Sequence, residues 1–256
     1  MKIIILAGGL GTRLSEYTKK IPKPMVDIHG KPILMHIIES YQRYGFNNFC
    51  IALGYKGDVI KKYFLELASL SPISNAELNS LEVLEVKIPN SDLKITLANT
   101  GQNTLTGGRL KRLKEYIGND TFMLTYGDGL SDVNFHQLLS AHQQSKKLVT
   151  VTAVHPVARF GELKIDNNNN VTSFKEKPQM QEGWINGGFF VVEPRILDFI
   201  DNDKTIFEEE PLEQAAKMNE FHAFKHEGFW YCMDTQRDKD YLENIIDQGT
   251  IPWMKI

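Results

Sequence analysis

Apolar and polar positions near the N-terminus follow two different periods. Residues 2–7 (KIIILA) form a short isoleucine-rich run that stops at glycines, which is typical of a buried parallel strand. From Ile33 the apolar residues recur three or four positions apart until Gly45, which predicts an amphipathic helix that ends at a glycine. A second strand is predicted over residues 49–53. The chain therefore begins as strand, helix, strand.

The same alternation continues along the chain. We predict a helix over residues 58–67, a strand over 93–98, a helix over 107–116 and a strand over 121–125. Alternating strands and helices indicate an α/β fold with a Rossmann-like, mostly parallel sheet flanked by helices. Residues 68–92 follow neither period and contain interspersed Ser, Asn and Pro, so we expect a long loop or lid there.

Strand patterns dominate beyond residue 148. The segments VTVTAV, FGELKI, VTSFKE and INGGFFVVE read as strands, and the asparagines at 167–170 predict a turn between the second and the third. These segments predict additional, partly antiparallel strands in the C-terminal half. Helices are expected again over residues 194–200, 208–217 and 235–248.

Composition limits the classes of partner. The 256 residues are 42% hydrophobic, enough for a substantial core and near the upper limit of one α/β domain, so we expect a single domain over residues 1–256. The formal net charge of -3 and the pI near 6.2 give no global basic field. Nucleic acid and an anionic membrane surface are therefore not expected as partners.

Cysteine use and the N-terminus indicate a reducing compartment. Cys50 and Cys232 lie far apart without CxxC spacing, so we expect idle or buried thiols and neither a disulfide framework nor a zinc site. The N-terminal apolar run of about six residues is too short for a signal peptide or a membrane span. The cytoplasm is the expected location.

A glycine-rich turn follows the first predicted strand. In LAGGLGTRL (residues 6–14), Gly8, Gly9 and Gly11 let the backbone approach a phosphate closely, and the neighbouring amides can face the anion. A dinucleotide fingerprint would place a third glycine where Leu14 stands, which disfavours a nicotinamide-dependent oxidoreductase.

Two cations accompany this turn. Arg13 lies inside it, and Lys23 follows ten residues later between two prolines. Two fixed cations beside a phosphate-binding loop suit a triphosphate better than a dinucleotide. The alternative is a tight turn followed by a solvated basic face formed by Lys19, Lys20 and Lys23.

Two aspartates are candidate metal ligands. Asp128 follows the apolar segment TFMLT between Gly127 and Gly129, at the strand end where open α/β sheets bind ligands. Asp234 follows GFWYCM and precedes a predicted helix, so its alternative role is that of a helix N-cap. Two converging carboxylates, phosphate oxygens and water would suit Mg²⁺. Sequence spacing does not bring the two residues together.

A series of blocks in matching order resembles the sugar-1-phosphate nucleotidyltransferase family, in its glucose-1-phosphate cytidylyltransferase branch. These blocks are GGLGTRL with PKPM, TGGRLKR, TYGDG, RFGEL, EKP, NGGFFV and GFWYCMDTQRD. The resemblance covers almost the whole chain, and residues 68–92 depart from it. It implies Mg²⁺-dependent in-line attack of α-D-glucose 1-phosphate on the α-phosphate of CTP, giving CDP-glucose and pyrophosphate.

The resemblance also implies an organisation and a biological setting. The nucleotide-binding part would cover about residues 1–130 and the sugar-binding part about 131–256. The product would supply deoxyhexoses of surface polysaccharide. A homo-oligomer is expected, with the 68–92 segment at its interface.

With this resemblance, specific residues receive roles. We assign Arg13 to the leaving pyrophosphate, Lys23 to the α-phosphate region, Lys177 to the incoming phosphate, and the metal to Asp128 and Asp234. The expected nucleotide-binding residues are Leu6, Ala7, Gly8, Gly9, Gly11, Thr12, Arg13, Lys23, Thr104, Gly108, Arg109, Gly127 and Asp128. The expected sugar-phosphate-binding residues are Glu176, Lys177, Asn186 and Gly187.

Several alternatives stay open. Arg109 belongs to a basic run that also reads as a solvated helix face, and we favour a ligand contact because Gly107 and Gly108 would leave room at the helix start. Lys177 also reads as a surface lysine at a strand end. The base could be uracil or thymine in place of cytosine. A catalytically silent homologue that binds nucleotide and regulates a partner is the alternative outside enzymes.

Overall fold

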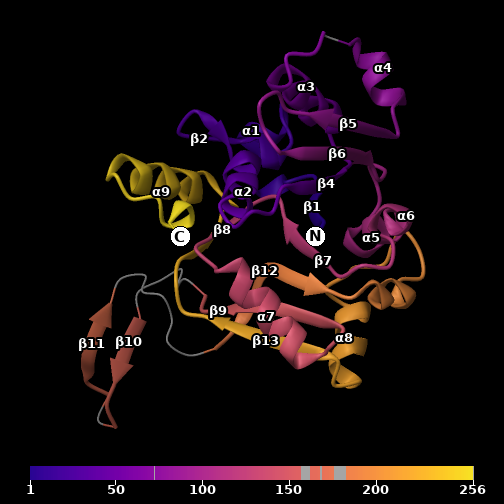
Figure 1. Cartoon of the computed structure of the whole chain (residues 1–256). Coiled ribbons are helices and arrows are strands. Elements are labelled where there is room, and N and C mark those ends of the chain that lie inside the picture. The colour runs from indigo at the N-terminus through magenta and orange to yellow at the C-terminus, as the bar shows by residue number, and fades with distance from the viewer. Residues whose placement is uncertain (72, 157–161, 168, 176–182, 256) are drawn as a thin grey trace.

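The computed structural model describes residues 1–256 except 72, 157–161, 168, 176–182 and 256 (Figure 1). Its centre is an eight-stranded sheet. In sheet order the strands are β13 (Phe221–His226), β9 (Val149–Val154), β12 (Ile185–Val192), β7 (Phe122–Tyr126), β1 (Ile3–Ala7), β4 (Asn48–Leu53), β6 (Lys94–Asn99) and β5 (Val83–Lys87).

The sheet is parallel where the N-terminal half builds it. β7, β1, β4 and β6 run parallel to one another, as the alternation of strands and helices predicts. β12 runs antiparallel to both β7 and β9, and β13 returns parallel to β9. The predicted Rossmann-like sheet with partly antiparallel C-terminal strands is confirmed.

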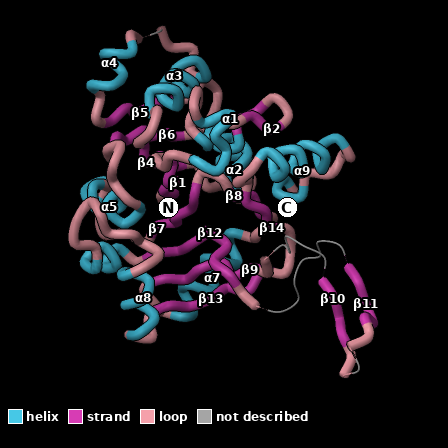
Figure 2. The backbone as a smooth tube through the Cα atoms, turned by 180° about the vertical axis from the view of Figure 1, so that it is seen from behind, coloured by secondary structure: helices cyan, strands magenta, loops and turns pink. Residues whose placement is uncertain are grey.

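Helices cover both faces of the sheet (Figures 1 and 2). One face packs against α2 (Ile33–Gln42), α3 (Gly57–Leu67), α7 (Phe135–Ser145) and α9 (Gln236–Asp247). The other packs against α5 (Thr106–Arg112), α6 (Lys114–Ile117), η3 (Pro194–Phe199) and α8 (Glu210–Lys217). The short helical turns are η1 (Thr12–Leu14), α1 (Ser15–Thr18), η2 (Lys23–Met25), α4 (Asn75–Ser80) and η4 (Pro252–Met254).

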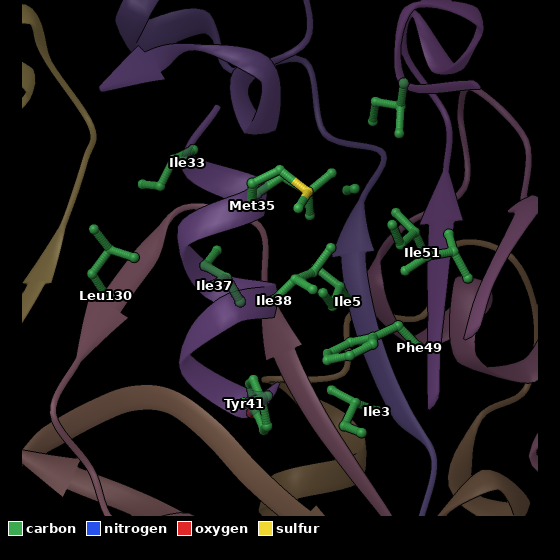
Figure 3. Packing of buried hydrophobic residues seen from close by; sticks show 14 of the residues in the cluster. Ile3, Ile5, Ile33, Met35, Ile37, Ile38, Tyr41, Phe49, Ile51 and Leu130 are labelled. Carbon is green, nitrogen blue, oxygen red and sulfur yellow. The ribbon is translucent and has the colours of Figure 1, made fainter. Parts of the chain in front are cut away.

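Strand β1 shows why the sheet needs both helical layers. Ile3 and Ile5 belong to the core on the α2 side, where α2 contributes Ile38 and Tyr41 (Figure 3). Ile4, on the opposite face of the strand, belongs to the second core. All three isoleucines have no exposed surface. Each such side chain contributes roughly 1.5–3 kcal/mol of transfer free energy, so β1 is anchored on both faces.

The expectation of a loop or lid over residues 68–92 is wrong. This segment forms α4 and then β5, which pairs antiparallel with β6 as the edge strand of the sheet. The ammonium of buried Lys61 donates to the carbonyls of Leu78 and Leu81 at 2.7 and 2.6 Å and ties α4 to α3. An edge strand in which Val86 alone is buried has too little apolar alternation to be recognised.

One further helical prediction needs correction, and one helix was not predicted. The helix expected over residues 107–116 is interrupted at Leu113, which caps α5 and precedes α6. Helix α7 was not predicted. Its buried stripe comprises Phe135, Leu138 and His142, and the histidine weakens the apolar period. Asn134 caps this helix by accepting a hydrogen bond from the amide of Gln137.

The described residues also form three small two-stranded sheets. They are β2 (Asp27–Ile28) with β3 (Lys31–Pro32), β10 (Glu162–Ile165) with β11 (Val171–Lys175), and β8 (Gly129–Ser131) with β14 (Trp230–Cys232). The β10–β11 hairpin comprises the described parts of the predicted FGELKI and VTSFKE segments and lies away from the main sheet in both views (Figures 1 and 2). Within the described part of the chain, no helix has the length and apolar character needed to cross a bilayer.

Candidate active site

A cavity of about 500 Å³ opens where β1 and β7 end. Of the expected site residues, it is lined by Leu6, Ala7, Gly8, Gly9, Gly11, Arg13, Lys23, Thr104, Arg109, Gly127, Asp128, Asn186, Gly187 and Asp234. Thr12 and Gly108 are described but do not line it. Glu176 and Lys177 lie outside the described residues, so their expected roles stay predictions.

The glycine turn requires a left-handed residue at one position. Gly11 has φ +63°, and a Cβ placed there would lie 2.8 Å from a methyl of Thr18 and 3.0 Å from the Cβ of Lys23. The carbonyl of Gly11 accepts the amide of Leu14 and the hydroxyl of Thr18. Leu14, which replaces the third glycine of a dinucleotide fingerprint, is fully buried. The C-terminal end of the turn is therefore held by the packing of Leu14 into the core.

Arg109 is buried against this turn, with 4% of its surface exposed, so the solvated-face alternative is wrong for this residue. Its Nη2 donates to the carbonyl of Gly8 at 2.9 Å. Its Nη1 donates to Leu53 O, Thr100 Oγ1 and Gly101 O at 3.0, 2.7 and 2.8 Å. Burial, with a smaller effect of nearby Arg112, lowers the pKa of Arg109 to about 10, so the guanidinium stays charged at neutral pH.

The two glycines before Arg109 serve packing, and the expectation that they leave room for a ligand is wrong. A Cβ on Gly108 would lie 2.5 Å from the Cα of Asp203, and one on Gly107 would lie 2.8 Å from the carbonyl of Thr205. They allow the backbone of residues 203–205 to lie directly against α5. Arg112 reinforces that contact by donating to both carboxylate oxygens of Asp203 at 2.9 and 2.6 Å.

Lys23 is the central cation of the cavity. Its ammonium lies 2.5 Å from Asp128 Oδ2 and 2.6 Å from Asp234 Oδ1, and the residue is only 9% exposed. Burial alone would lower the pKa of Lys23, but the adjacent carboxylates outweigh burial and raise it. Arg13 pairs with the second oxygen of Asp234. Lys23 is therefore no part of a solvated face, unlike exposed Lys19 and Lys20.

A short strand pair explains why Asp128 meets Asp234. β8 begins one residue after Asp128, and β14 ends two residues before Asp234. In this ladder Gly129 is paired with Cys232, and the amide of Met233 donates to the carbonyl of Asp128 at 2.9 Å. The carboxylates and the thiol of Cys232 offer ligand atoms within 4.8 Å of one another.

Asp234 is not the helix N-cap. Thr235 caps α9, and its side chain forms a reciprocal capping box with Asp238. The carboxylate of Asp234 instead accepts from Arg13 and Lys23. The residue just before the cap is thus left free for the cavity.

The donor set fits a hard divalent cation. Ionised carboxylate oxygens are ligands that such ions prefer. Burial, followed by the negative charge of Asp128, raises the pKa of the Cys232 thiol, so the group stays protonated at neutral pH. A neutral thiol is a poor ligand for a hard cation. In the free protein the ammonium of Lys23 is the counter-ion of both carboxylates.

Several cavity residues were not singled out from the sequence as ligand contacts. Trp230 lines the cavity and donates from Nε1 to the carbonyl of Gly187 at 2.7 Å. Tyr126, inside the TYGDG block, packs against Gly188, where a Cβ would lie 2.6 Å from its ring. The local sequence around an aromatic residue at a strand end does not show whether its side chain packs in the core or lines a cavity.

The chain is similar to known nucleotidyltransferases in sequence and in fold. The sequence model of the nucleotidyl transferase family matches residues 2–246. Glucose-1-phosphate cytidylyltransferase of Salmonella typhimurium is 47% identical over 256 residues, which cover 99% of this chain and 98% of that protein. Probable glucose-1-phosphate cytidylyltransferase of Bacillus subtilis is 44% identical over 254 residues, with 99% of each chain covered. The crystal structure of HddC from Yersinia pseudotuberculosis superimposes with a TM-score of 0.70 at 26% identity, covering 96% of this chain and 99% of that one.

Two neighbouring glycines give a matched test of the Arg109 packing. A Cβ on Gly8 would fall 2.2 Å from the guanidinium carbon of Arg109, whereas a Cβ on Gly9 meets nothing within 4 Å. We expect Gly8→Ala to destabilise the ligand-free protein by about 1–3 kcal/mol, because Arg109 must leave its carbonyl partners. Gly9→Ala should unfold at the wild-type temperature or slightly above it. Thermal unfolding followed by circular dichroism measures both, and equal melting temperatures for the two variants would contradict the packing.

Proposed function

The chain belongs to the nucleotidyl transferase family, and on that premise we propose that it joins CTP to α-D-glucose 1-phosphate, forming CDP-glucose and releasing pyrophosphate. The near full-length relatives named for this reaction support the substrate pair. The observation that carries the chemistry is the cluster of Lys23, Asp128 and Asp234 beside a glycine turn. That cluster suits a reaction whose main demand is charge neutralisation.

No general base is needed for this reaction. A phosphate monoester has a second pKa of about 6, so the sugar 1-phosphate is mostly a dianion at neutral pH and is already a nucleophile. One of its oxygens forms the new bond to the α-phosphorus. The bond from that phosphorus to the β-phosphate oxygen breaks, and pyrophosphate leaves with the electron pair. The protonated Cys232 thiol is not required as a nucleophile.

We assign each basic side chain of the site to one of the phosphate groups that take part in the reaction. Arg13, which is exposed at the mouth, would meet the leaving pyrophosphate. Lys23 would meet the α-phosphate, and Lys177 the incoming phosphate. The glycine turn would supply backbone amides to the triphosphate.

We propose Mg²⁺ as the metal, held by Asp128 and Asp234. When bound, it would neutralise triphosphate charge next to the reacting phosphorus. The ammonium of Lys23 lies between these carboxylates in the free protein. A divalent cation held by the same two carboxylates would compete with this ammonium, and a displaced Lys23 would be available to the α-phosphate.

Further properties complete the proposal. The nucleotide would bind mainly to residues of about 1–130 and the sugar to residues of about 131–256. The enzyme would act in the cytoplasm as a homo-oligomer, with no nucleic acid or membrane partner. CDP-glucose would feed the synthesis of deoxyhexoses for surface polysaccharide.

A substrate matrix tests the proposed reaction. We expect CTP with α-D-glucose 1-phosphate to give the highest kcat/KM among CTP, UTP, dTTP, ATP and GTP combined with several hexose 1-phosphates, measured as pyrophosphate release. A preference for UTP or dTTP would replace the cytidylyl assignment by a sister activity. Binding of nucleotide without any pyrophosphate release would indicate a silent regulatory homologue.

Removal of the Lys23 ammonium should reduce turnover with little loss of folding. Lys23→Ala is expected to lower kcat roughly 100-fold, because the site loses a fixed cation where two anions must meet. Steady-state kinetics at saturating substrates, together with circular dichroism, measure the effect. Lys20→Ala, which changes an exposed lysine of the same segment, is the control. Near-wild-type turnover of Lys23→Ala would refute the assigned role.

The two aspartates should behave as one unit. Asp128→Asn and Asp234→Asn should each lower activity strongly and raise the Mg²⁺ concentration needed for half-maximal rate. The double variant should lose far less than the product of the single losses, because one absent ligand already disables the site. Since Thr235 caps α9, Asp234→Asn should leave that helix intact. An unchanged Mg²⁺ titration for Asp234→Asn would remove this residue from the metal site.

A further inference from the structure

Glu208 joins two side chains that line the cavity. One carboxylate oxygen accepts the hydroxyl of Tyr126, at the end of β7. The other accepts the hydroxyl of Thr106, at the start of α5, at 2.5 Å. Glu208 is half-buried directly after fully buried Phe207. It thereby links the helix that carries Arg109 to the strand that leads to Asp128.

The direction of each hydrogen bond in this group is determined. The amide of Phe207 donates to Thr106 Oγ1 at 2.9 Å, so the single hydrogen of this hydroxyl must point elsewhere. It points to Glu208, because an ionised carboxylate only accepts. The hydrogen of the Tyr126 hydroxyl also points to Glu208 for the same reason. Tyr126 Oη therefore presents only lone pairs to any other group.

The Tyr126 ring is held in place around this oxygen. Gly188, with φ +79°, lies so close that a Cβ there would be 2.6 Å from the ring. Phe190 packs edge-on at a centroid distance of 6.0 Å. Burial, followed by the negative charge of Glu208, raises the pKa of Tyr126, so the hydroxyl keeps its hydrogen. The orientation of the lone pairs is thus a fixed property of the cavity.

The surroundings of Tyr126 Oη suit a sugar ring better than a phosphate. Asn186 donates from Nδ2 to this oxygen in a long hydrogen bond of 3.5 Å, and Gly187 and Trp230 line the same cavity. These groups are neutral and either polar or aromatic, whereas the cations Arg13 and Lys23 gather at the aspartates. Uncharged hydrogen-bonding groups beside an aromatic face are suited to a polyhydroxylated ring.

We propose that Glu208 is a positioning residue that makes Tyr126 an obligate hydrogen-bond acceptor for one hydroxyl of the sugar 1-phosphate. This inference rests on the proposed nucleotidyl transfer to a hexose 1-phosphate. The selected hydroxyl must donate to Tyr126, so its position and configuration on the ring contribute to sugar selectivity.

Replacement of the carboxylate by an amide inverts this polarity. In Glu208→Gln, Thr106 still accepts from Phe207, and it keeps the hydrogen bond that it donates only if the amide oxygen faces it. The amide NH₂ then faces Tyr126, whose hydroxyl must turn its hydrogen toward the cavity. The substitution removes one charge and keeps the shape of the side chain. It also converts Tyr126 from a hydrogen-bond acceptor into a donor toward the cavity.

Deoxyfluoro analogues of α-D-glucose 1-phosphate detect that inversion, because fluorine cannot donate a hydrogen bond. We expect wild-type kcat/KM to fall at least about tenfold for the analogue fluorinated at the contacted position, mainly through KM for the sugar phosphate. Glu208→Gln should raise KM for glucose 1-phosphate about tenfold, leave KM for CTP within about twofold, and shrink the penalty for that analogue. Exposed Glu209→Gln is the matched control and should behave as wild type.

Tyr126→Phe gives an independent second variant. It removes the acceptor, so it should reproduce the loss caused by the fluorinated analogue, and adding Glu208→Gln to it should have no further effect. Equal losses for all analogues, an effect on KM for CTP alone, or full additivity of the two substitutions would overturn the inference. Wild-type turnover of CTP with glucose 1-phosphate is measured first. If the wild-type protein does not turn over CTP with glucose 1-phosphate, the proposed function is wrong. The role of Glu208 is then tested separately, by comparing Glu208→Gln with wild type on the substrates that the protein does use.

Discussion

The pairing of β8 with β14 is the constraint on which the site depends. Three residue pairs in this ladder bring Asp128 and Asp234 together, although the two residues lie 106 positions apart in the sequence. Two adjacent carboxylates repel each other in a partly buried site, and the ammonium of Lys23 offsets that repulsion in the free protein. The strand pair therefore assembles a site with two negative charges, and Lys23 neutralises part of that charge in the free protein.

The glycine turn and Arg109 solve a second problem of buried charge. Arg109 is desolvated, but four oxygen atoms from three different segments accept its hydrogen bonds. One of those oxygens belongs to Gly8, so the same guanidinium holds the turn that lines the cavity. A nucleotide bound as proposed would meet a backbone that this guanidinium already holds in place. Lys23 and Glu208 each join two side chains in a comparable way. Lys23 pairs with Asp128 and Asp234. Glu208 accepts hydrogen bonds from Thr106 and Tyr126.

The sequence predicted those parts of the site whose structure is determined by residues adjacent in the chain. The isoleucine run of β1, the glycine turn and the strand end at Asp128 all follow from residues adjacent in sequence. Asp234 was ambiguous, because a carboxylate before a helix is a natural cap, and only the register of β14 and the cap at Thr235 distinguish the two roles. Glu208 gave no signal, since its partners lie about a hundred and about eighty positions away. Edge strand β5 was missed because one buried valine leaves too little alternation.

Binding of Mn²⁺ to the nucleotide-free protein tests the central claim most directly, with electron paramagnetic resonance reporting the free ion. If Lys23 is the internal counter-ion of a shared metal site, Lys23→Ala should bind Mn²⁺ at least about tenfold more tightly than wild type, because the two carboxylates lose their ammonium. Adding Asp128→Asn to that variant should abolish the gain. Equal Mn²⁺ affinities for wild type and Lys23→Ala would contradict the account.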